Sequence, residues 1–333
     1  MPNQQVLSRP AAPVAWASRR HRAMGSFAEV LVWGPHAESL ADWATTEIER
    51  CEASWSRFRP QSDLCALNAR AGHGPTGVSP LLWEALAFAR DAYVQTGGLF
   101  DPTVLDSLLA WGYDRSFPFP SPVGDLDHQP SAAPGFATVE LDTENRTVSL
   151  PLACHLDLGG IGKGLAADRV VVGLAARGAH SSCVSMGGDV RVAGPGPDHD
   201  DAWDIRVEDP RNDRAAFTFP LVDEALAQSS TSFRRWQHGT RSVHHLIDPR
   251  TGYPSSSGID CAVVTARETW RAETLAKAAL LAGPLDGLAM LERAGVDGWL
   301  LGHDGVIHAT LHVADVNWTH PHLTGAAPEE TSQ

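Results

Sequence analysis

A short glycine-rich segment constrains this chain more than any other feature. Residues 155–168 read His-Leu-Asp-Leu-Gly-Gly-Ile-Gly-Lys-Gly-Leu-Ala-Ala-Asp, so a carboxylate, four glycines and a lysine fall within eight residues. A strand-like run precedes the segment and a helix-like run follows it. The glycines let the backbone approach a ligand closely, Lys163 supplies a cation, and Asp157 can accept a hydrogen bond from a ring. The segment therefore predicts a site for an anionic, phosphorylated ligand.

Two common nucleotide-binding motifs do not match this segment. A P-loop requires a Ser or Thr after its lysine to hold magnesium, whereas Gly164 follows Lys163. A dinucleotide fingerprint requires the spacing GxGxxG and an acidic residue about 20 positions later, but the region around His180 carries no acid. An ordinary glycine-rich turn at the start of a helix over 161–177 stays open as the simplest alternative.

The composition predicts a globular protein with a substantial core. Of the 333 residues, 43% are hydrophobic and 20% are charged, and the formal net charge is −14. Such an acidic chain is unsuited to bind nucleic acid or an anionic membrane surface. It also repels nucleotides at long range, so a nucleotide pocket must contain its own cations, and Lys163 is the natural candidate.

The cysteines and the N-terminal region predict a cytoplasmic location. The five cysteines have neither CxxC nor CxxH spacing, which indicates reduced, mostly buried thiols rather than disulfides or a zinc site. The N-terminal region carries arginines but no continuous apolar run and no lipobox cysteine. No stretch approaches the roughly 18 apolar residues of a membrane-spanning helix, so we expect no membrane insertion.

We predict a single domain over residues 21–323, between a flexible leader at 1–20 and a disordered tail at 324–333. Five prolines mark residues 115–136 as an excursion on the surface without a catalytic role. Strands and helices mix without strict alternation, which favours an α+β fold with largely antiparallel sheets and covering helices over a doubly wound fold.

Periodicity and turn residues predict individual elements. Apolar residues recur at helical spacing from Leu40 to Trp55, and Ser79-Pro80 is a typical helix start. Two more helices are expected over 270–281 and 285–294. Strand patterns occupy residues 28–33, 139–150 (two short strands around Asn145), 182–186, 203–207 and 261–265.

Six segments carry a resemblance to a known family. The segment Asp157–Gly164 has the form DxxGxxKG. The other five are Met24-Gly25-Ser26, Ser56–Asn68, Thr96–Thr103 (TGGLFDPT), Gly187-Gly188-Asp189 followed by Trp203 and Asp209-Pro210, and His245–Gly252 (HLIDPRTG). In this order they resemble the motifs of the ApbE-like FAD:protein FMN transferases. Each fragment is modest alone, but together they extend the resemblance over residues 24–283.

The resemblance implies a fold and a reaction. The fold would be α+β, with two lobes around a cleft for a flavin nucleotide. In the family, a Thr or Ser hydroxyl of an acceptor flavoprotein attacks the FMN-side phosphorus of FAD, FMN becomes attached through a phosphoester bond, and AMP leaves. A divalent cation, Mg²⁺, bridges the pyrophosphate. Phosphoryl transfer of this kind depends mainly on positioning and on neutralisation of charge.

The resemblance also implies roles for individual residues. Asp157 and Lys163 would contact FAD, and the carbonyl of Gly160 would be a metal ligand. His245 would relay the acceptor proton or contact phosphate, unless it is an ordinary structural histidine. The remaining residues expected in the flavin pocket are Met24, Phe58, Leu99, Phe100, Asp101 and Leu246. For the two phenylalanines, a plain core position is the alternative.

One site departs from the family pattern. Where the family has an Asp and, four residues later, a Thr as metal ligands, this chain has Glu273 and Lys277. Glutamate can still bind Mg²⁺, but a protonated lysine cannot. Three interpretations stay open: Lys277 neutralises the pyrophosphate in place of the metal, the site binds flavin without efficient transfer, or the two residues form an exposed i,i+4 ion pair without a role.

Two rival functions would use the same site. If water replaces the acceptor hydroxyl, the protein is an FAD pyrophosphatase that yields FMN and AMP. If Lys277 replaces the metal and turnover is lost, the protein binds FAD without catalysis. Metal dependence separates the two enzymes from the binding protein, and a requirement for the acceptor separates transfer from hydrolysis.

Overall fold

The computed structural model describes residues 14–118, 130–197, 201–209 and 212–311. Its centre is an eight-stranded sheet in the order β1-β2-β6-β7-β10-β15-β16-β17, in which every neighbouring pair is antiparallel. The strands are β1 (Val14–Ala23), β2 (Ser26–Pro35), β6 (Ser181–Met186), β7 (Asp189–Ala193), β10 (Ala225–Ser230), β15 (Ile259–Ala266), β16 (Asp297–Gly302) and β17 (Ile307–Ala309). The predicted α+β class with antiparallel sheets is confirmed.

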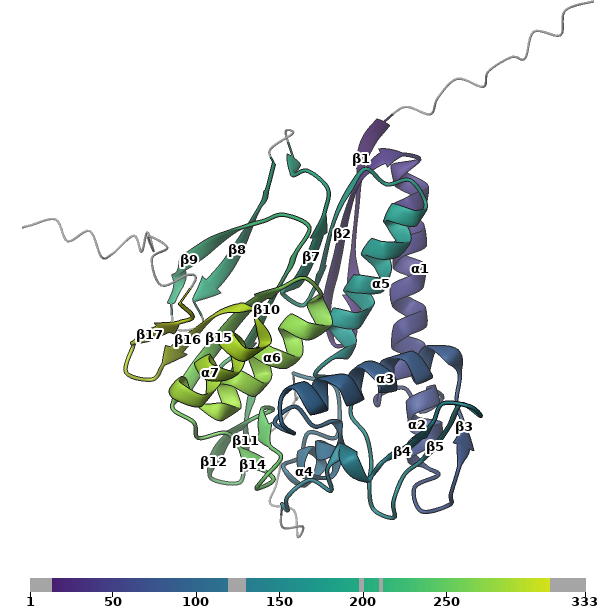
Figure 1. Ribbon diagram of the computed structural model, residues 1–333, viewed down its shortest axis with the longest axis vertical. Coiled ribbons are helices and arrows are strands. Elements are labelled where there is room, and N and C mark those ends of the chain that lie inside the picture. The colour runs from purple at the N-terminus through teal and green to yellow at the C-terminus, as the bar shows by residue number, and fades with distance from the viewer. Residues whose placement is uncertain (1–13, 119–129, 198–200, 210–211, 312–333) are drawn as a thin grey trace, which may run out of the picture.

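Four helices cover one face of this sheet (Figure 1). They are α1 (Ala37–Trp55), α5 (Gly162–Ala176), α6 (Thr269–Ala282) and α7 (Pro284–Ala294). Helices α1 and α5 contact each other over the β1, β2 and β6 part of the sheet, and α6 and α7 contact each other over β15 and β16. Because α5 also contacts α6, the two pairs form one continuous layer.

A separate hairpin covers the opposite face. Its strands are β8 (Trp203–Asp209) and β9 (Asn212–Leu221). Phe219 of the hairpin packs edge-to-face on Trp299 of β16, with ring centroids 4.8 Å apart. The next residue of β16, Leu300, belongs to the core under α6 and α7. Since side chains alternate along a strand, β16 is buried on both faces.

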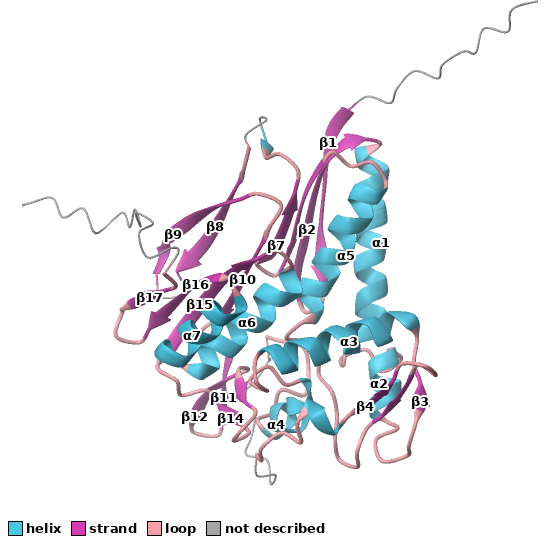
Figure 2. Cartoon of the chain, in the orientation of Figure 1, coloured by secondary structure: helices cyan, strands magenta, loops and turns pink. Residues whose placement is uncertain are grey.

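The remaining elements form a loop-rich part below the sheet in Figure 2. Helix α3 (Pro80–Gln95) begins where predicted, because the Ser79 side chain accepts the N–H of Leu82 (3.2 Å) and Pro80 fits the first helical turn. The other elements are α2 (Asp63–Asn68), α4 (Leu105–Ala110), the 3₁₀ helices η1 (Pro102–Val104) and η2 (Phe136–Thr138), the sheet β3 (Thr76–Gly77)-β5 (Thr147–Ser149)-β4 (Glu140–Asp142), and the hairpins β11 (Arg235–His238)–β12 (Arg241–His244) and β13 (Ile247–Asp248)–β14 (Tyr253–Pro254).

The helices and strands predicted from periodicity are confirmed. Helices occur at 37–55, 80–95, 269–282 and 284–294, and strands at 26–35, 140–142, 147–149, 181–186, 203–209 and 259–266. The thiols also agree with the prediction, because all five cysteines are free and Cys51, Cys154 and Cys261 are buried.

The predicted flexible leader over 1–20 is wrong for residues 14–20. These residues belong to β1, which pairs with β2 along its whole length, from Val14 opposite Pro35 to Ala23 opposite Ser26. Every second side chain of an edge strand can remain in water, so the arginines of β1 are compatible with a paired strand. Residues 1–13 and the predicted tail at 324–333 lie outside the described residues.

The predicted surface excursion at 115–136 is corrected at its C-terminal end. The Ala133 amide donates to the carbonyl of Pro249 (2.8 Å), and Phe136 is only 2% exposed. This end is therefore packed into the molecule, because Phe136 supplies apolar area to the core under α3. Residues 119–129 lie outside the described part of the chain.

Candidate active site

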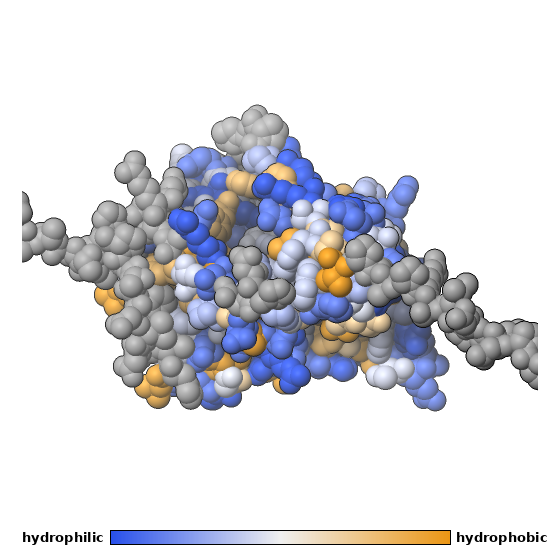
Figure 3. Space-filling model, turned by 90° about the horizontal axis from the view of Figure 1, so that it is seen from above, coloured by the Kyte–Doolittle hydropathy of each residue, from blue (hydrophilic) through white to orange (hydrophobic). Residues whose placement is uncertain are grey.

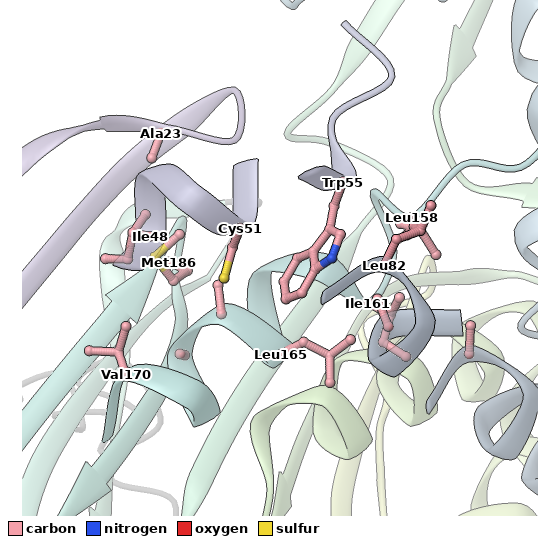
Figure 4. Close-up of a cluster of buried hydrophobic side chains, with 14 of the residues drawn as sticks. Ala23, Ile48, Cys51, Trp55, Leu82, Leu158, Ile161, Leu165, Val170 and Met186 are labelled. Carbon is pink, nitrogen blue, oxygen red and sulfur yellow. The ribbon is translucent and has the colours of Figure 1, made fainter. Parts of the chain in front are cut away.

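The glycine-rich segment is held from three sides. The Asn68 side chain brackets Leu156, because its amide donates to the Leu156 carbonyl (2.9 Å) and its oxygen accepts the Leu156 N–H (2.8 Å). The Asp157 amide donates to the Pro102 carbonyl (2.8 Å). Leu158, Ile161 and Trp55 anchor the segment in the core between α1 and α5 (Figure 4). The loop is therefore a fixed part of the fold, as a binding site requires.

The Asp157 carboxylate lies at the mouth of the segment. It accepts the Gly159 N–H (2.8 Å) and lies 3.5 Å from Nε of Arg57. The Arg57 guanidinium lies 4.1 Å from the ring centroid of Phe58 and 4.6 Å from that of Tyr113. The Arg57 side chain is 6% exposed, and its Nη2 has no hydrogen-bond partner among the described residues. A buried, unpaired guanidinium nitrogen of this kind is suited to bind a ligand oxygen.

Two adjoining pockets form a continuous cleft over this segment. Both are lined by Gly159, Lys163, Arg234, His245 and Lys277. The first pocket also has aromatic walls from Trp55, Phe58, Phe100 and Tyr113. The second is more polar and is lined by Gly187, Gly188, Asp189, Ser229, Ser230 and Glu273, among others. The cleft thus has an aromatic end and a polar end.

The structure brings together all but one of the residues expected in the site. The first pocket contains Met24, Phe58, Leu99, Phe100, Asp101, Asp157 and Gly160, and the second contains Glu273. Lys163, His245 and Lys277 line both. The exception is Leu246, which is 1% exposed in the core and lines neither pocket. The backbone of Leu246 has a structural role, since its carbonyl accepts the Ser255 N–H (2.9 Å).

A buried ion cluster closes the polar end. Lys163 Nζ lies 2.5 Å from Asp189 Oδ2 and also donates to Glu273 Oε1. The other oxygen of Glu273 accepts the Gly164 N–H (2.8 Å). Although burial opposes the charge, the two carboxylates raise the pKa of Lys163, which keeps it protonated. Burial raises the pKa of Asp189 to about 6, against the influence of Lys163. Of the three interpretations left open for Glu273 and Lys277, the exposed i,i+4 ion pair is excluded, because Glu273 is buried and pairs with Lys163.

Lys277 lies over the glycine-rich segment. A Cβ atom on Gly160 would be 1.8 Å from Lys277 Nζ, so the ammonium rests directly on this glycine. Nζ is 5.9 Å from the ring centroid of Phe100. In the described part of the chain, no carboxylate lies within ion-pair distance of it. Burial lowers the pKa of Lys277, although Glu273 opposes this shift and favours the ammonium.

His245 is a neutral imidazole in the wall shared by both pockets. Its Nδ1 is buried and has no hydrogen-bond partner among the described residues. Burial and the nearby charges of Arg234 and Lys277 lower the pKa of His245 well below its usual value. A neutral imidazole with an unoccupied nitrogen can accept a proton at neutral pH.

The residues at the predicted metal position do not fit a divalent cation. Both oxygens of Glu273 are occupied, by Lys163 and by the Gly164 amide. The other predicted ligand, Gly160, lies under the Lys277 ammonium. No group of three or more His, Cys, Asp or Glu side chains among the described residues could hold a metal ion. A magnesium site would need oxygen donors where this chain places ammonium groups.

Comparison with known proteins shows the family to which this chain belongs. The family model of the ApbE family matches residues 24–300, which include every residue of the cleft named above. The chain belongs to the ApbE family. A FAD:protein FMN transferase of Treponema pallidum (strain Nichols) is 29% identical over 320 residues, which cover 90% of this chain and 88% of that relative. A FAD:protein FMN transferase of Rhodobacter capsulatus is 29% identical over 314 residues, which cover 92% of this chain and 58% of that relative.

Solved structures support the same fold for this ApbE-family chain. The crystal structure of the ApbE protein from Thermotoga maritima MSB8 superposes with a TM-score of 0.77 at 24% identity, and covers 90% of this chain and 98% of that one. The apo crystal structure of the flavinyl transferase ApbE from Pseudomonas stutzeri superposes with a TM-score of 0.76 at 24% identity, and covers 90% and 95%.

The sequence predictions missed several charged or aromatic residues of the ApbE-family cleft, among them Arg57, Tyr113, Asp189 and Arg234. Arg57 and Asp189 lie inside recognised motifs, and their charge next to motif glycines or aromatics was a usable signal. Tyr113 and Arg234 lie in irregular segments and meet only in the folded chain, where Arg234 Nη1 donates to the Tyr113 hydroxyl (3.1 Å).

The described helices of this ApbE-family member include none that is both long and apolar enough to cross a membrane. The face seen from above in Figure 3 carries mostly hydrophilic residues, and its hydrophobic residues lie in small, separate patches.

Proposed function

We propose that this ApbE-family protein transfers FMN from FAD to a Thr or Ser hydroxyl of an acceptor flavoprotein and releases AMP. The observation that carries the proposal is the cleft itself, in which an aromatic pocket adjoins a polar pocket and both share Lys163, His245 and Lys277. A flavin nucleotide has the same division into a flat ring and a charged phosphate chain. The ApbE-family match and the names of the relatives support the same reaction.

The aromatic end would hold the flavin ring. Phe58 and Tyr113 present flat surfaces, with ring centroids 5.8 Å apart, and Asp157 offers a carboxylate oxygen to a ring N–H. Phe100 lies in the same pocket at 2% exposure, so it combines the predicted pocket role with a core position. Asp101 would have a structural role rather than contact FAD, because its carboxylate accepts the Thr103 N–H (2.9 Å) and caps η1.

The polar end would hold the phosphates and the reacting groups. The acceptor hydroxyl oxygen attacks the FMN-side phosphorus, the bond from that phosphorus to the bridging oxygen breaks, and AMP leaves with the bonding electrons. His245, neutral because of its lowered pKa, accepts the hydroxyl proton. Lys163 and Lys277 stabilise the negative charge on the phosphates.

The magnesium dependence implied by the family resemblance forms no part of this proposal. The donor set around Gly160 and Glu273 does not fit the metal, so no step is assigned to it. We retain the predicted cytoplasmic location, which the five free thiols support. The acceptor would then also be a cytoplasmic protein.

Transfer, hydrolysis and simple binding can be separated in one experiment. Purified protein is incubated with FAD, with and without a candidate acceptor flavoprotein, and AMP and free FMN are quantified. Transfer predicts AMP only with the acceptor and no free FMN. A pyrophosphatase would release AMP and FMN without any acceptor, and a binding protein would release neither. The Asp157→Ala variant should bind FAD more weakly, and unchanged affinity would contradict the assignment of the ring pocket.

A further inference from the structure

The chain contains only two lysines, and both lie in the cleft. All other residues among its 26 Lys and Arg are arginines, so Lys163 and Lys277 are the only ammonium side chains of a protein with net charge −14. They come from different helices, α5 and α6, yet they line the same two pockets. The chain thus concentrates its compact cations at the place where a phosphate chain would lie.

The two ammonium groups have different surroundings. Lys163 is committed to Asp189 and Glu273, so its charge is already balanced by two carboxylates. Lys277 has no carboxylate within ion-pair distance among the described residues, and it rests on Gly160 at the junction of the pockets. An ammonium without a counter-ion in a cleft can bind an anionic ligand without first losing another partner.

We propose that the Lys277 ammonium takes the place of a divalent cation, so that this protein binds FAD as a metal-free pyrophosphate. The inference rests on the proposed function and deepens it, because it names the form of the substrate. Two features of the site support it. Glu273, the carboxylate that a metal would need, is held by Lys163, and a metal beside Gly160 would lie next to the positive charge of Lys277.

A fixed ammonium can act on phosphate oxygens as a point charge with three donors. Gly160 gives it room, since any side chain there would collide with Nζ. Helix α6 positions it, since residues 269–282 are packed against β10 and β15. The cation would therefore be in place before the ligand arrives, and binding would need no metal from solution.

The first test measures FAD affinity by flavin fluorescence, in EDTA and in excess Mg²⁺. The wild-type affinity should change less than twofold between the two conditions, and Lys277→Gln should bind FAD at least tenfold more weakly in EDTA. Arg90→Gln, which removes one positive charge from an exposed site on α3 outside the cleft, should match the wild type. A wild-type affinity that collapses in EDTA and returns with Mg²⁺ would overturn the proposal.

The second test depends on the chain having only two lysines. It observes Lys277 in the wild-type protein, so its result does not depend on the stability of a variant. Selective ¹⁵N labelling of lysine gives two side-chain signals, and Lys277→Gln identifies which one belongs to residue 277. FAD should shift the Lys277 signal in the presence of EDTA, and Mg²⁺ alone should leave it unchanged. A shift that appears only when Mg²⁺ accompanies FAD would overturn the proposal.

Failure of the proposed function is distinguishable from failure of this inference. If FAD binds in EDTA and shifts Lys277 but neither AMP nor covalent FMN forms with an acceptor, the transferase assignment fails and the role of Lys277 stands. If covalent transfer occurs but EDTA abolishes both binding and transfer, the transferase stands and the role of Lys277 fails.

Discussion

The backbone of Gly164 lies directly against that of Trp270, so that a Cβ atom added to Gly164 would be 2.6 Å from the Trp270 amide nitrogen. Helices α5 and α6 therefore meet at their first turns. Asp168 of α5 secures the contact, because its carboxylate accepts the N–H groups of Thr269 (2.9 Å) and Trp270 (3.0 Å). These N–H groups have no partner inside their own helix, so Asp168 acts as the cap of α6. The contact places the next turn of α6 beside the glycine-rich segment.

Replacement of Gly164 by alanine should lower the free energy of unfolding by about 2–3 kcal/mol, because backbone atoms of α6 cannot move aside for the methyl group. Urea denaturation followed by tryptophan fluorescence measures this change. Gly162→Ala is the matched control: its Cβ would meet only Trp55 Cε3, at 3.8 Å, and alanine favours a helix over glycine by up to about 1 kcal/mol, so the stability of this variant should be unchanged or slightly higher. Equal stability of the two variants would contradict the close approach.

Replacement of Gly160 by alanine should weaken FAD binding but, unlike Gly164→Ala, change the stability of the protein little. Its methyl group would meet the end of a flexible side chain, Lys277 Nζ at 1.8 Å, so Lys277 can swing away and the protein should lose less than about 1 kcal/mol of stability. The displaced ammonium no longer reaches the phosphates, so FAD should bind several-fold more weakly. Titration of FAD against the folded variant checks this, and an unchanged affinity would show that the position of Lys277 is unimportant.

Lys163→Met should both destabilise the protein and weaken FAD binding. The substitution leaves Asp189 and Glu273 buried without their cation, which costs about 3–5 kcal/mol for a broken buried pair. Adding Glu273→Gln should recover part of the stability, because one unpaired charge is removed. Urea denaturation of the single and double variants supplies the comparison. No recovery in the double variant would argue against the ion cluster.

His245→Gln should reduce transfer by about 10²–10⁴-fold while FAD affinity changes little, since general base catalysis contributes about that factor. The pH profile provides a second check. The lowered pKa means that His245 stays neutral above its folded-state pKa and loses its function only when the pH falls through that low value. Between about pH 6 and 8, a range that includes the ordinary histidine pKa, the wild-type rate should therefore show no inflection that is due to His245. An inflection near an unshifted histidine pKa that disappears in the variant would contradict this environment.

Local sequence patterns were sufficient for most elements that cover the site. The helix beginning at Pro80 follows from its Ser79 cap, and the helix over 37–55 follows from apolar spacing, because both depend on near neighbours in the chain. Strand β1 was missed because its order comes from pairing with β2, and its own arginine-rich pattern carries little signal.

In the site too, features that depend on near neighbours in the chain could be predicted, and features that depend on long-range contacts could not. The motif residues Asp157, Lys163 and His245 were predicted together and do line one cleft. Helical spacing left a Glu273–Lys277 pair open as one alternative, and only the fold shows that Lys163 of α5 is the partner of Glu273. Tyr113 could not be predicted, since its place in the wall depends on contacts far apart in the sequence, among them its packing against Trp236, with ring centroids 5.4 Å apart, and its hydrogen bond from Arg234.

The most direct test of the transferase assignment is the intact mass of a candidate acceptor flavoprotein after incubation with this protein and FAD, with AMP quantified in the same sample. We expect an added FMN on a Thr or Ser of the acceptor, with one AMP released for each FMN attached, and no addition when that residue is replaced by alanine. AMP formation with an unmodified acceptor, or no AMP at all despite bound FAD, would contradict the assignment.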